Sequence, residues 1–327
     1  MNLNLSIYSK YRTQIMGLAA TMIILCHIRG VDFSGIPVVE KLLSLGGYGV
    51  ELFLFVSGIG MYYSLTNKDK EVGSIGHWYK RRYIRILVPF LLISVSIYPL
   101  RFILNVSASW SDFLLCVTTL EYWIYHRGAW YVAMLFPLYF LTPYLFKTIY
   151  GSNLKFVAIS VLITLLLTFS YVSITDCEII RNIQFVTVRI PIFIIGIWIA
   201  PYIKHNYKLS MIQTIFIVLS GLLLMHYSNL SLGGGIAIVF LAGVFIALIC
   251  KCEIINDFLS LMGKMSLESY LTNIYFGHII MNSDVLNLSG GVKSLIVIVF
   301  GVLAAYIFNK MSNRIIDKIK KCHTSIF

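Results

Sequence analysis

The chain has 327 residues, of which 58% are hydrophobic and only 12% are charged, and its mean hydropathy is +0.84. A soluble domain of this length needs many more charged residues to cover its surface, so the composition excludes a soluble globular protein. The net charge of +12 would suit a nucleic-acid partner, but the basic residues flank apolar runs along the whole chain. We therefore expect the lysines and arginines to interact with membrane lipid, and we expect no nucleic-acid partner.

Apolar runs of about 20 residues, long enough to cross a hydrocarbon core of roughly 30 Å as helices, recur along the chain. They lack the short alternating pattern of a barrel, so the predicted fold is an all-α integral membrane bundle of about ten transmembrane helices. The predicted spans are 11–30, 47–66, 83–104, 129–148, 153–172, 185–203, 210–227, 232–250, 266–283 and 291–310. We expect one membrane domain over residues 1–327, with no soluble domain appended.

The distribution of basic residues predicts the orientation. With a cytoplasmic N-terminus, ten spans place 19 of the 26 lysines and arginines at cytoplasmic ends, a strong positive-inside bias. Both termini are therefore expected in the cytoplasm. Residues 254–264 have the mixed polarity of a short helix lying along the cytoplasmic interface. The aromatic residues of 109–127 suit the outer interface of the membrane.

His27 is the most informative residue of the first span, because ionisable groups inside a membrane are costly. It follows Arg12 by fifteen residues, a helical rise of about 22 Å, which predicts a place in the outer half of the membrane. A neutral imidazole there could act as a general base. The alternative interpretation is a histidine that hydrogen-bonds between helices.

The second span contains Glu51 near its outer end, within a glycine-rich segment over 46–60 that suits close helix packing. Glu51 could pair with Arg29 across the hairpin or orient a catalytic histidine. Ser57 lies in the middle of this span. A nucleophilic role for Ser57 is disfavoured because no base is adjacent and the segment is not a strand–elbow–helix.

A basic segment precedes the third span and contains Arg81, Arg82 and Arg85. Arg82 and Arg85 are three residues apart and so share a helix face. Guanidinium groups suit phosphate oxygens, which makes the segment a candidate phosphate site. The alternative is that these residues only mark a cytoplasmic helix end.

Other polar residues lie in or near later spans. Arg189 begins the sixth span, where a buried arginine needs an anion or carbonyl groups. His126 and Arg127 precede Tyr131 at the start of the fourth span, as weaker candidates. The residues interpreted as hydrogen-bond formers between helices are Asn273, His226 and His278.

The six cysteines form no metal-ligand set, and we expect no bound metal. Cys116 and Cys177 are both predicted on the outer side of the membrane. Cys116 and Cys177 could form a disulfide, but two buried thiols are the favoured interpretation.

Six segments together resemble acyltransferase family 3, the bacterial integral membrane O-acyltransferases, over nearly the whole chain. These segments are GLAATMIILCH, GVELFLFVSGIGMYYS, KRRYIRILVPF, WYVAMLFPLYFLTPYLF, RIPIFIIG and MGKMSLESYLTNIY, in that order. Many members carry Asp and Arg where Thr13 and Met16 stand, and histidine where Asn273 stands. The acid partner of His27 is therefore open, and Glu51 is the candidate.

The resemblance implies an acyltransferase of the bacterial cell membrane. Its co-substrate would be acetyl-CoA or another acyl-CoA, with no permanently bound cofactor, and its acceptor an envelope saccharide or lipid-linked sugar. His27 would be the base and Arg81, Arg82 and Arg85 would hold the coenzyme A phosphates. The candidate oxyanion or acceptor contacts are Ser57, Tyr131 and Arg189. Direct transfer and an acyl-histidine step both stay open, and the alternatives to an enzyme are a transporter or an inactive scaffold.

Overall fold

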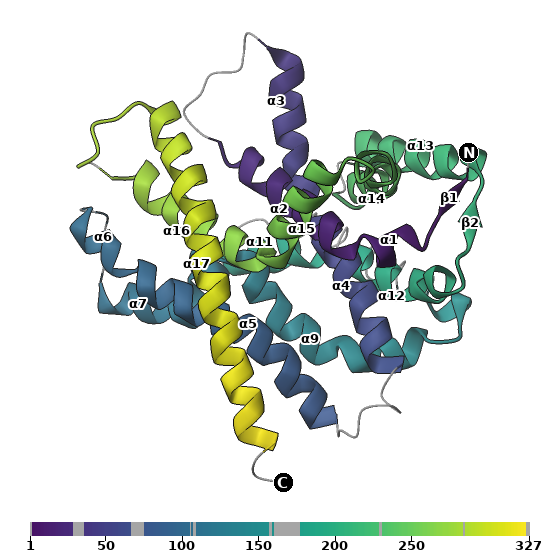
Figure 1. Cartoon of the computed structure of the whole chain (residues 1–327), viewed down its shortest axis with the longest axis horizontal. Helices are drawn as coiled ribbons and strands as arrows, with labels where there is room; N and C mark the ends of the chain where they lie inside the picture. Colours follow the sequence, from purple (N-terminus) through teal and green to yellow (C-terminus); the bar gives the residue numbers. More distant parts are fainter. Residues whose placement is uncertain are drawn as a thin grey trace. The chain divides into compact units, whose positions relative to one another are not determined.

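The computed structural model describes residues 2–28, 36–66, 75–104, 106, 109–156, 159, 177–228, 231–283 and 285–324 (Figure 1). The described residues are almost entirely helical, which confirms the all-α class. The β-structure among them is one short antiparallel ladder between β1 (Leu3–Asn4) and β2 (Lys208–Leu209). It pairs Leu3 with Leu209 and Asn4 with Lys208.

Nine of the ten predicted spans coincide with a helix among the described residues. These helices are α2 (Arg12–Cys26), α4 (Gly49–Thr66), α5 (Ile75–Ile97), α9 (Trp130–Ile149), α12 (Ile190–Lys204), α13 (Met211–Ser228), α14 (Ser231–Ile249), α16 (Ser266–Met281) and α17 (Gly290–Thr324). The tenth, over 153–172, lies mostly outside the described residues. The other helices of the described residues are α1 (Ile7–Lys10), α3 (Pro37–Ser44), α6 (Pro99–Ile103), α7 (Trp110–Val117), α8 (Leu120–Tyr125), α11 (Glu178–Thr187) and α15 (Glu253–Lys264). A 3₁₀ turn, η1 (Leu45–Tyr48), joins α3 to α4.

Six helices in the described ranges are long and apolar enough to cross a membrane. They are Pro37–Thr66, Ile75–Ile103, Trp130–Ile149, Glu178–Lys204, Leu232–Ile249 and Gly290–Lys321. Arg12–Cys26 and Met211–His226 are apolar but shorter, and α16 has 16 residues. The protein is therefore a multi-pass membrane protein, whereas the count of ten spans stays a prediction.

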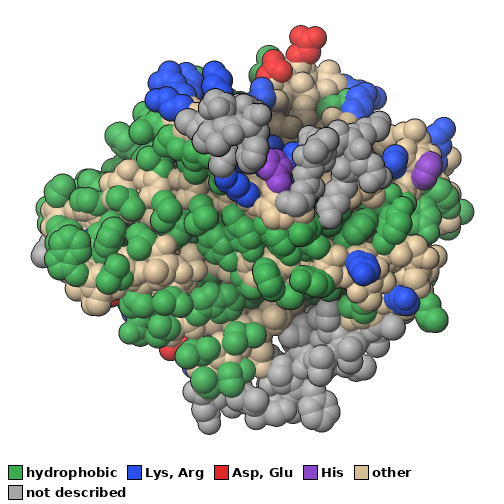
Figure 2. Space-filling view, turned by 90° about the horizontal axis from the view of Figure 1, so that it is seen from below, with side chains coloured by type: hydrophobic (Ala, Val, Ile, Leu, Met, Phe, Trp, Pro, Cys, Tyr) green, Lys and Arg blue, Asp and Glu red, His purple; other side chains and the backbone are tan. Residues whose placement is uncertain are grey.

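Large hydrophobic side chains are widespread on the surface, as Figure 2 shows for one face. On α13, Ile212 is 81% exposed and Phe216 is 71% exposed, and Leu303 on α17 is 57% exposed. Exposing so much apolar area to water would be unfavourable, so these side chains suit contact with lipid.

The described chain forms two compact units. The first contains Met1–Thr21, Gly47–Val72 and Leu138–Lys264. Here α4 packs closely on α12, because a Cβ atom added to Gly58 would lie 2.2 Å from the Phe193 carbonyl oxygen. A Cβ atom on Gly196 would likewise lie 2.2 Å from the Phe55 carbonyl oxygen. The packing role predicted for the glycine-rich second span is confirmed at Gly58.

The N-terminal segment is also fixed within this unit. Tyr8 is fully buried and its hydroxyl donates to the Val239 carbonyl, 3.0 Å away. The helix predicted over 254–264 is confirmed as α15, and its Gly263 packs against the backbone of Thr13. The outward side chains of α15 include Ile254 and Phe258, which are 82% and 50% exposed and suit an interfacial helix.

The second unit contains Met22–Gly46, Gly73–Pro137 and Met265–Phe327. Its frame is made by α5, α16 and α17, each of which packs on the other two. The Thr272 hydroxyl of α16 donates to the Gly301 carbonyl of α17 at 2.8 Å. Two short helices, α7 and α8, occupy the segment predicted as an outer aromatic belt. Trp110 is 80% exposed, as that prediction requires, but Tyr122 is buried.

Candidate active site

His27 follows the last residue of α2, in the second unit. Its Nδ1 lies 2.7 Å from Oδ1 of Asn273, a buried residue of α16. An amide oxygen can only accept, so Nδ1 of His27 carries the proton in this bond. The neutral ring then has its basic lone pair on Nε2, which is the arrangement that a general base needs.

His27 and Asn273 line a cavity of about 300 Å³ within the second unit. This volume is at the small end of the range for ligand pockets. The other polar residues that line it are His126, Arg127, Trp130, His278 and Ser294. Asn273 and Ser294 are buried, whereas His126 and Arg127 are exposed, so the last two lie where the cavity opens.

The turn that contains His126 has an unusual backbone. His126 follows the last residue of α8 and lies in the left-handed region with φ 53°, and Gly128 has φ 78°. Thr119, just before α8, also has a positive φ of 64°. Left-handed non-glycine residues cost free energy and are enriched at functional sites. A Cβ atom on Gly128 would lie 3.0 Å from Oε2 of Glu121, so a side chain at 128 would crowd that carboxylate.

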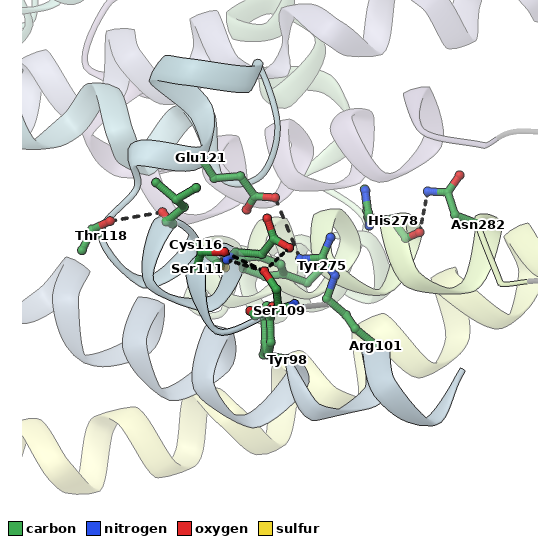
Figure 3. Close-up of polar contacts among 12 residues, drawn as sticks. Tyr98, Arg101, Ser109, Ser111, Cys116, Thr118, Glu121, Tyr275, His278 and Asn282 are labelled. Carbon is green, nitrogen blue, oxygen red and sulfur yellow. Dashed lines mark hydrogen bonds and ion pairs between the residues drawn. The ribbon is translucent and has the colours of Figure 1, made fainter. Parts of the chain in front are cut away.

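A polar cluster lies beside this turn (Figure 3). Arg101 Nη1 is 3.9 Å from Glu121 Oε1, and both side chains are largely buried. Burial raises the pKa of Glu121, although Arg101 and Arg127 oppose this shift. A cavity of about 20 Å³ is lined by Arg101, Glu121, Gly128 and His278, among others. Gly128 and His278 also line the larger cavity, so the cluster adjoins it.

Cys116 belongs to the same cluster. Its sulfur donates to the Tyr275 hydroxyl at 3.4 Å, and burial raises the pKa of Cys116 to about 11. At neutral pH this thiol is protonated and a poor nucleophile. Cys116 and Cys177 are both free thiols, so the disulfide considered between them from the sequence does not form. Cys177 is exposed, so the prediction of two buried thiols is wrong for Cys177, which precedes α11.

Glu51 and Arg189 form a buried ion pair in the first unit, with 3.1 Å between Arg189 Nε and Glu51 Oε1. Arg189 also donates to the Phe185 carbonyl. The prediction that a buried Arg189 needs an anion or carbonyl groups is confirmed. Arg29, the partner considered for Glu51, lies outside the described residues. The role of Glu51 as the acid partner of His27 stays a prediction.

The other predicted site residues lie on α4, α9 and, for the three arginines, α5. Tyr131 is buried on α9 and its backbone N–H donates to the Tyr270 hydroxyl at 3.1 Å. Ser57 is half-buried in the middle of α4. Tyr131 is not among the residues that line the cavity; its neighbour Trp130 is.

The predicted phosphate site lies in the first turns of α5. Arg81 and Arg82 are half-buried and Arg85 is exposed, and the Arg82 guanidinium lies 5.8 Å from the Trp78 ring centroid. Arg82 precedes Ile97, which lines the smaller cavity, by fifteen residues, a helical rise of about 22 Å. The three arginines therefore lie far along α5 from the cluster beside His27.

The sequence predicts His27 as the leading candidate and Asn273, His278, His126 and Arg127 as weaker ones. The sequence signal for these residues is the free-energy cost of placing a polar group near a membrane span, and all five residues share that signal. Asn273 was interpreted as a hydrogen-bond former between helices, and its bond to His27 confirms this. Among the described residues, no group of three or more His, Cys, Asp or Glu side chains is arranged to hold a metal ion.

Comparison with known proteins adds one finding to this geometry. A family model described as an acyltransferase domain, that of acyltransferase family 3, matches residues 15–310. Neither a curated protein nor a solved structure matches the chain. The matched range contains His27, Asn273 and every other residue that lines the larger cavity.

Proposed function

Since the chain belongs to acyltransferase family 3 and is a membrane acyltransferase, we propose that it uses an acyl-CoA donor. The acyl group, most simply acetyl, passes to a hydroxyl of an envelope saccharide or lipid-linked sugar, in a bacterial cell membrane with both termini cytoplasmic. The observation that carries this proposal is the hydrogen bond between His27 and Asn273 in a cavity of about 300 Å³.

His27 is the proposed general base. The acceptor hydroxyl oxygen attacks the thioester carbonyl carbon while Nε2 of His27 takes the hydroxyl proton. The carbon–sulfur bond then breaks, and the coenzyme A thiolate leaves and receives that proton from the imidazolium. Such proton transfer typically contributes 10²–10⁴-fold in rate. Asn273 supports this role by holding the ring through Nδ1, so that Nε2 remains the basic atom.

The basic end of α5 is the proposed donor site. Arg81, Arg82 and Arg85 hold the coenzyme A phosphates, since guanidinium forks bind phosphate oxygens in pairs. Because α5 packs on α16, which contributes Asn273, the extended pantetheine arm would run along α5 toward His27. In a second route Nε2 of His27 is the nucleophile: it takes the acyl group as the coenzyme A thiolate leaves, and the acceptor hydroxyl then attacks the acyl carbon and releases its proton to the thiolate by way of the imidazole. The roles of Glu51, Ser57, Tyr131 and Arg189 stay predictions, open to the same substitution assay.

The test uses the full chain in lipid nanodiscs with radiolabelled acetyl-CoA and a crude envelope saccharide. We expect His27→Ala to abolish transfer while coenzyme A binding is kept. We expect Arg82→Ala/Arg85→Ala to weaken coenzyme A binding. The matched control is Arg314→Ala, which removes an exposed arginine of α17 and should change neither.

Two outcomes would contradict the proposal. If folded wild-type protein does not bind coenzyme A, the acyl-CoA donor is refuted. If His27→Ala retains full transfer, His27 is not the base. Accumulation of saccharide inside sealed proteoliposomes without acylation would instead favour the transporter considered from the sequence.

A further inference from the structure

The opening of the larger cavity has a distinct charge. Two exposed basic residues, His126 and Arg127, line the cavity. His27 and His278 also line it and are only half-buried, so they are less exposed than the first two. None of the described residues that line it is Asp or Glu. A cavity with one guanidinium, three imidazoles and no lining carboxylate favours a ligand with a negative charge.

Two acids of the described residues, Glu121 and Asp112, interact with each other beside the turn that contains Arg127. Glu121 interacts with Arg101 as well as Arg127, so one carboxylate faces two guanidinium groups. Asp112 also acts on Glu121, but the Ser109 hydroxyl donates to its carboxylate at 2.6 Å. Neither acid lines the larger cavity, although Glu121 lines the smaller one.

Arg127 belongs to the turn that follows α8. It lies between His126 and Gly128, which both have positive φ angles, and the Glu121 carboxylate lies close to Gly128. The guanidinium of Arg127 lies 6.0 Å from the Tyr125 ring centroid. Such a contact uses the face of the ring and leaves the guanidinium edge oriented for hydrogen bonds.

We propose that Arg127, with His126 and His278 beside it, binds an anionic group of the acceptor, namely a carboxylate or phosphate on a sugar unit. This inference rests on the proposed function and names the acceptor's chemical class. The sugar ring would fill the cavity, with one hydroxyl toward His27 and the anionic group toward Arg127. A volume of about 300 Å³ suits one such unit, with the rest of a longer chain outside.

The test measures binding without any acyl donor, so that it does not depend on catalysis. Trp130 lines the cavity, and its fluorescence in nanodiscs reports occupancy, with Trp130→Phe identifying its share of the signal. The probes are methyl glucoside, methyl glucuronide, methyl glucoside 6-phosphate and inorganic phosphate. For wild type we expect one anionic glycoside to bind at least about tenfold more tightly than methyl glucoside.

The variants separate charge from folding. Arg127→Gln should reduce the preference to about threefold or less, because the fork that pairs with the anion is lost. Arg127→Lys keeps the charge and should retain part of the preference. Arg314→Gln is the matched control and should behave as wild type. Each variant is first checked for monodispersity by gel filtration.

The possible outcomes each decide the question. A preference for the glucuronide identifies a carboxylate, and a preference for the 6-phosphate identifies a phosphate. Equal binding of neutral and anionic glycosides overturns the subsite. Inorganic phosphate that binds as tightly as the sugar phosphate also overturns it, because the sugar then contributes nothing. In either case the separate acetyl-transfer assay with His27→Ala still decides the proposed function by itself.

Discussion

Substituting Asn273 by alanine tests whether the hydrogen bond to His27 serves the chemistry. The bond is 2.7 Å long and Asn273 is only 4% exposed, so bulk water does not replace the hydrogen bond that His27 loses in the variant. A hydrogen bond contributes about 0.5–1.5 kcal/mol net. If all of that orients the imidazole, kcat should fall about 2- to 13-fold, since each 1.36 kcal/mol is tenfold in rate. The KM for the acyl-CoA donor should not change.

Thr272→Val is the matched control for this experiment. Thr272 precedes Asn273 on α16, is also buried, and its hydroxyl donates to the Gly301 carbonyl of α17. Its loss should lower the melting temperature without lowering kcat. The assay is steady-state acetyl transfer in nanodiscs over a range of acetyl-CoA concentrations. Unchanged kcat in Asn273→Ala, or an equal fall in both variants, would refute the orienting role.

Two further predictions concern the reactivity of two thiols and the strength of a buried ion pair. Maleimide should label Cys177 rapidly at pH 7.5 and Cys116 only slowly. The reason is that Cys177 is exposed, whereas Cys116 is buried and has a pKa of about 11. Mass spectrometry measures the two labelling rates, and equal rates would contradict the prediction. Arg189→Met should destabilise the protein by about 3–5 kcal/mol because it leaves the Glu51 carboxylate buried without its cation, and adding Glu51→Gln should recover much of the loss. Thermal unfolding in detergent measures this, and equal melting temperatures for the Arg189 variant and wild type would show that the pair is dispensable.

The positions of the helices could be predicted from the sequence because hydropathy is a local property. Apolar runs alone located nine described helices, including α16 with its buried polar residues. Lengths were less predictable, since α2 is five residues shorter than the span predicted over 11–30. The chain leaves the helix at His27, and no local pattern marked that end.

Individual candidates were also visible in the sequence, because an ionisable group near a span needs a reason wherever it occurs. His27, Glu51 and Arg189 are identifiable in this way, but their partners are not. The sequence allows Glu51 to pair with Arg29, whereas the structure pairs Glu51 with Arg189. From the sequence Asn273 is a hydrogen-bond former without an assigned partner, and in the structure its partner is His27, 246 residues away.

The sequence by itself therefore determined the membrane class, the positions of nine helices and the family, and it made His27 a candidate. The tertiary structure decided which polar groups meet, that His126, Arg127 and His278 share a cavity with His27, and that Arg101 and Glu121 lie beside it. Hydropathy and motifs depend on neighbours along the chain. A pair or a cavity depends on how distant helices pack, and this is fixed only when side chains from several segments compete for the same buried space.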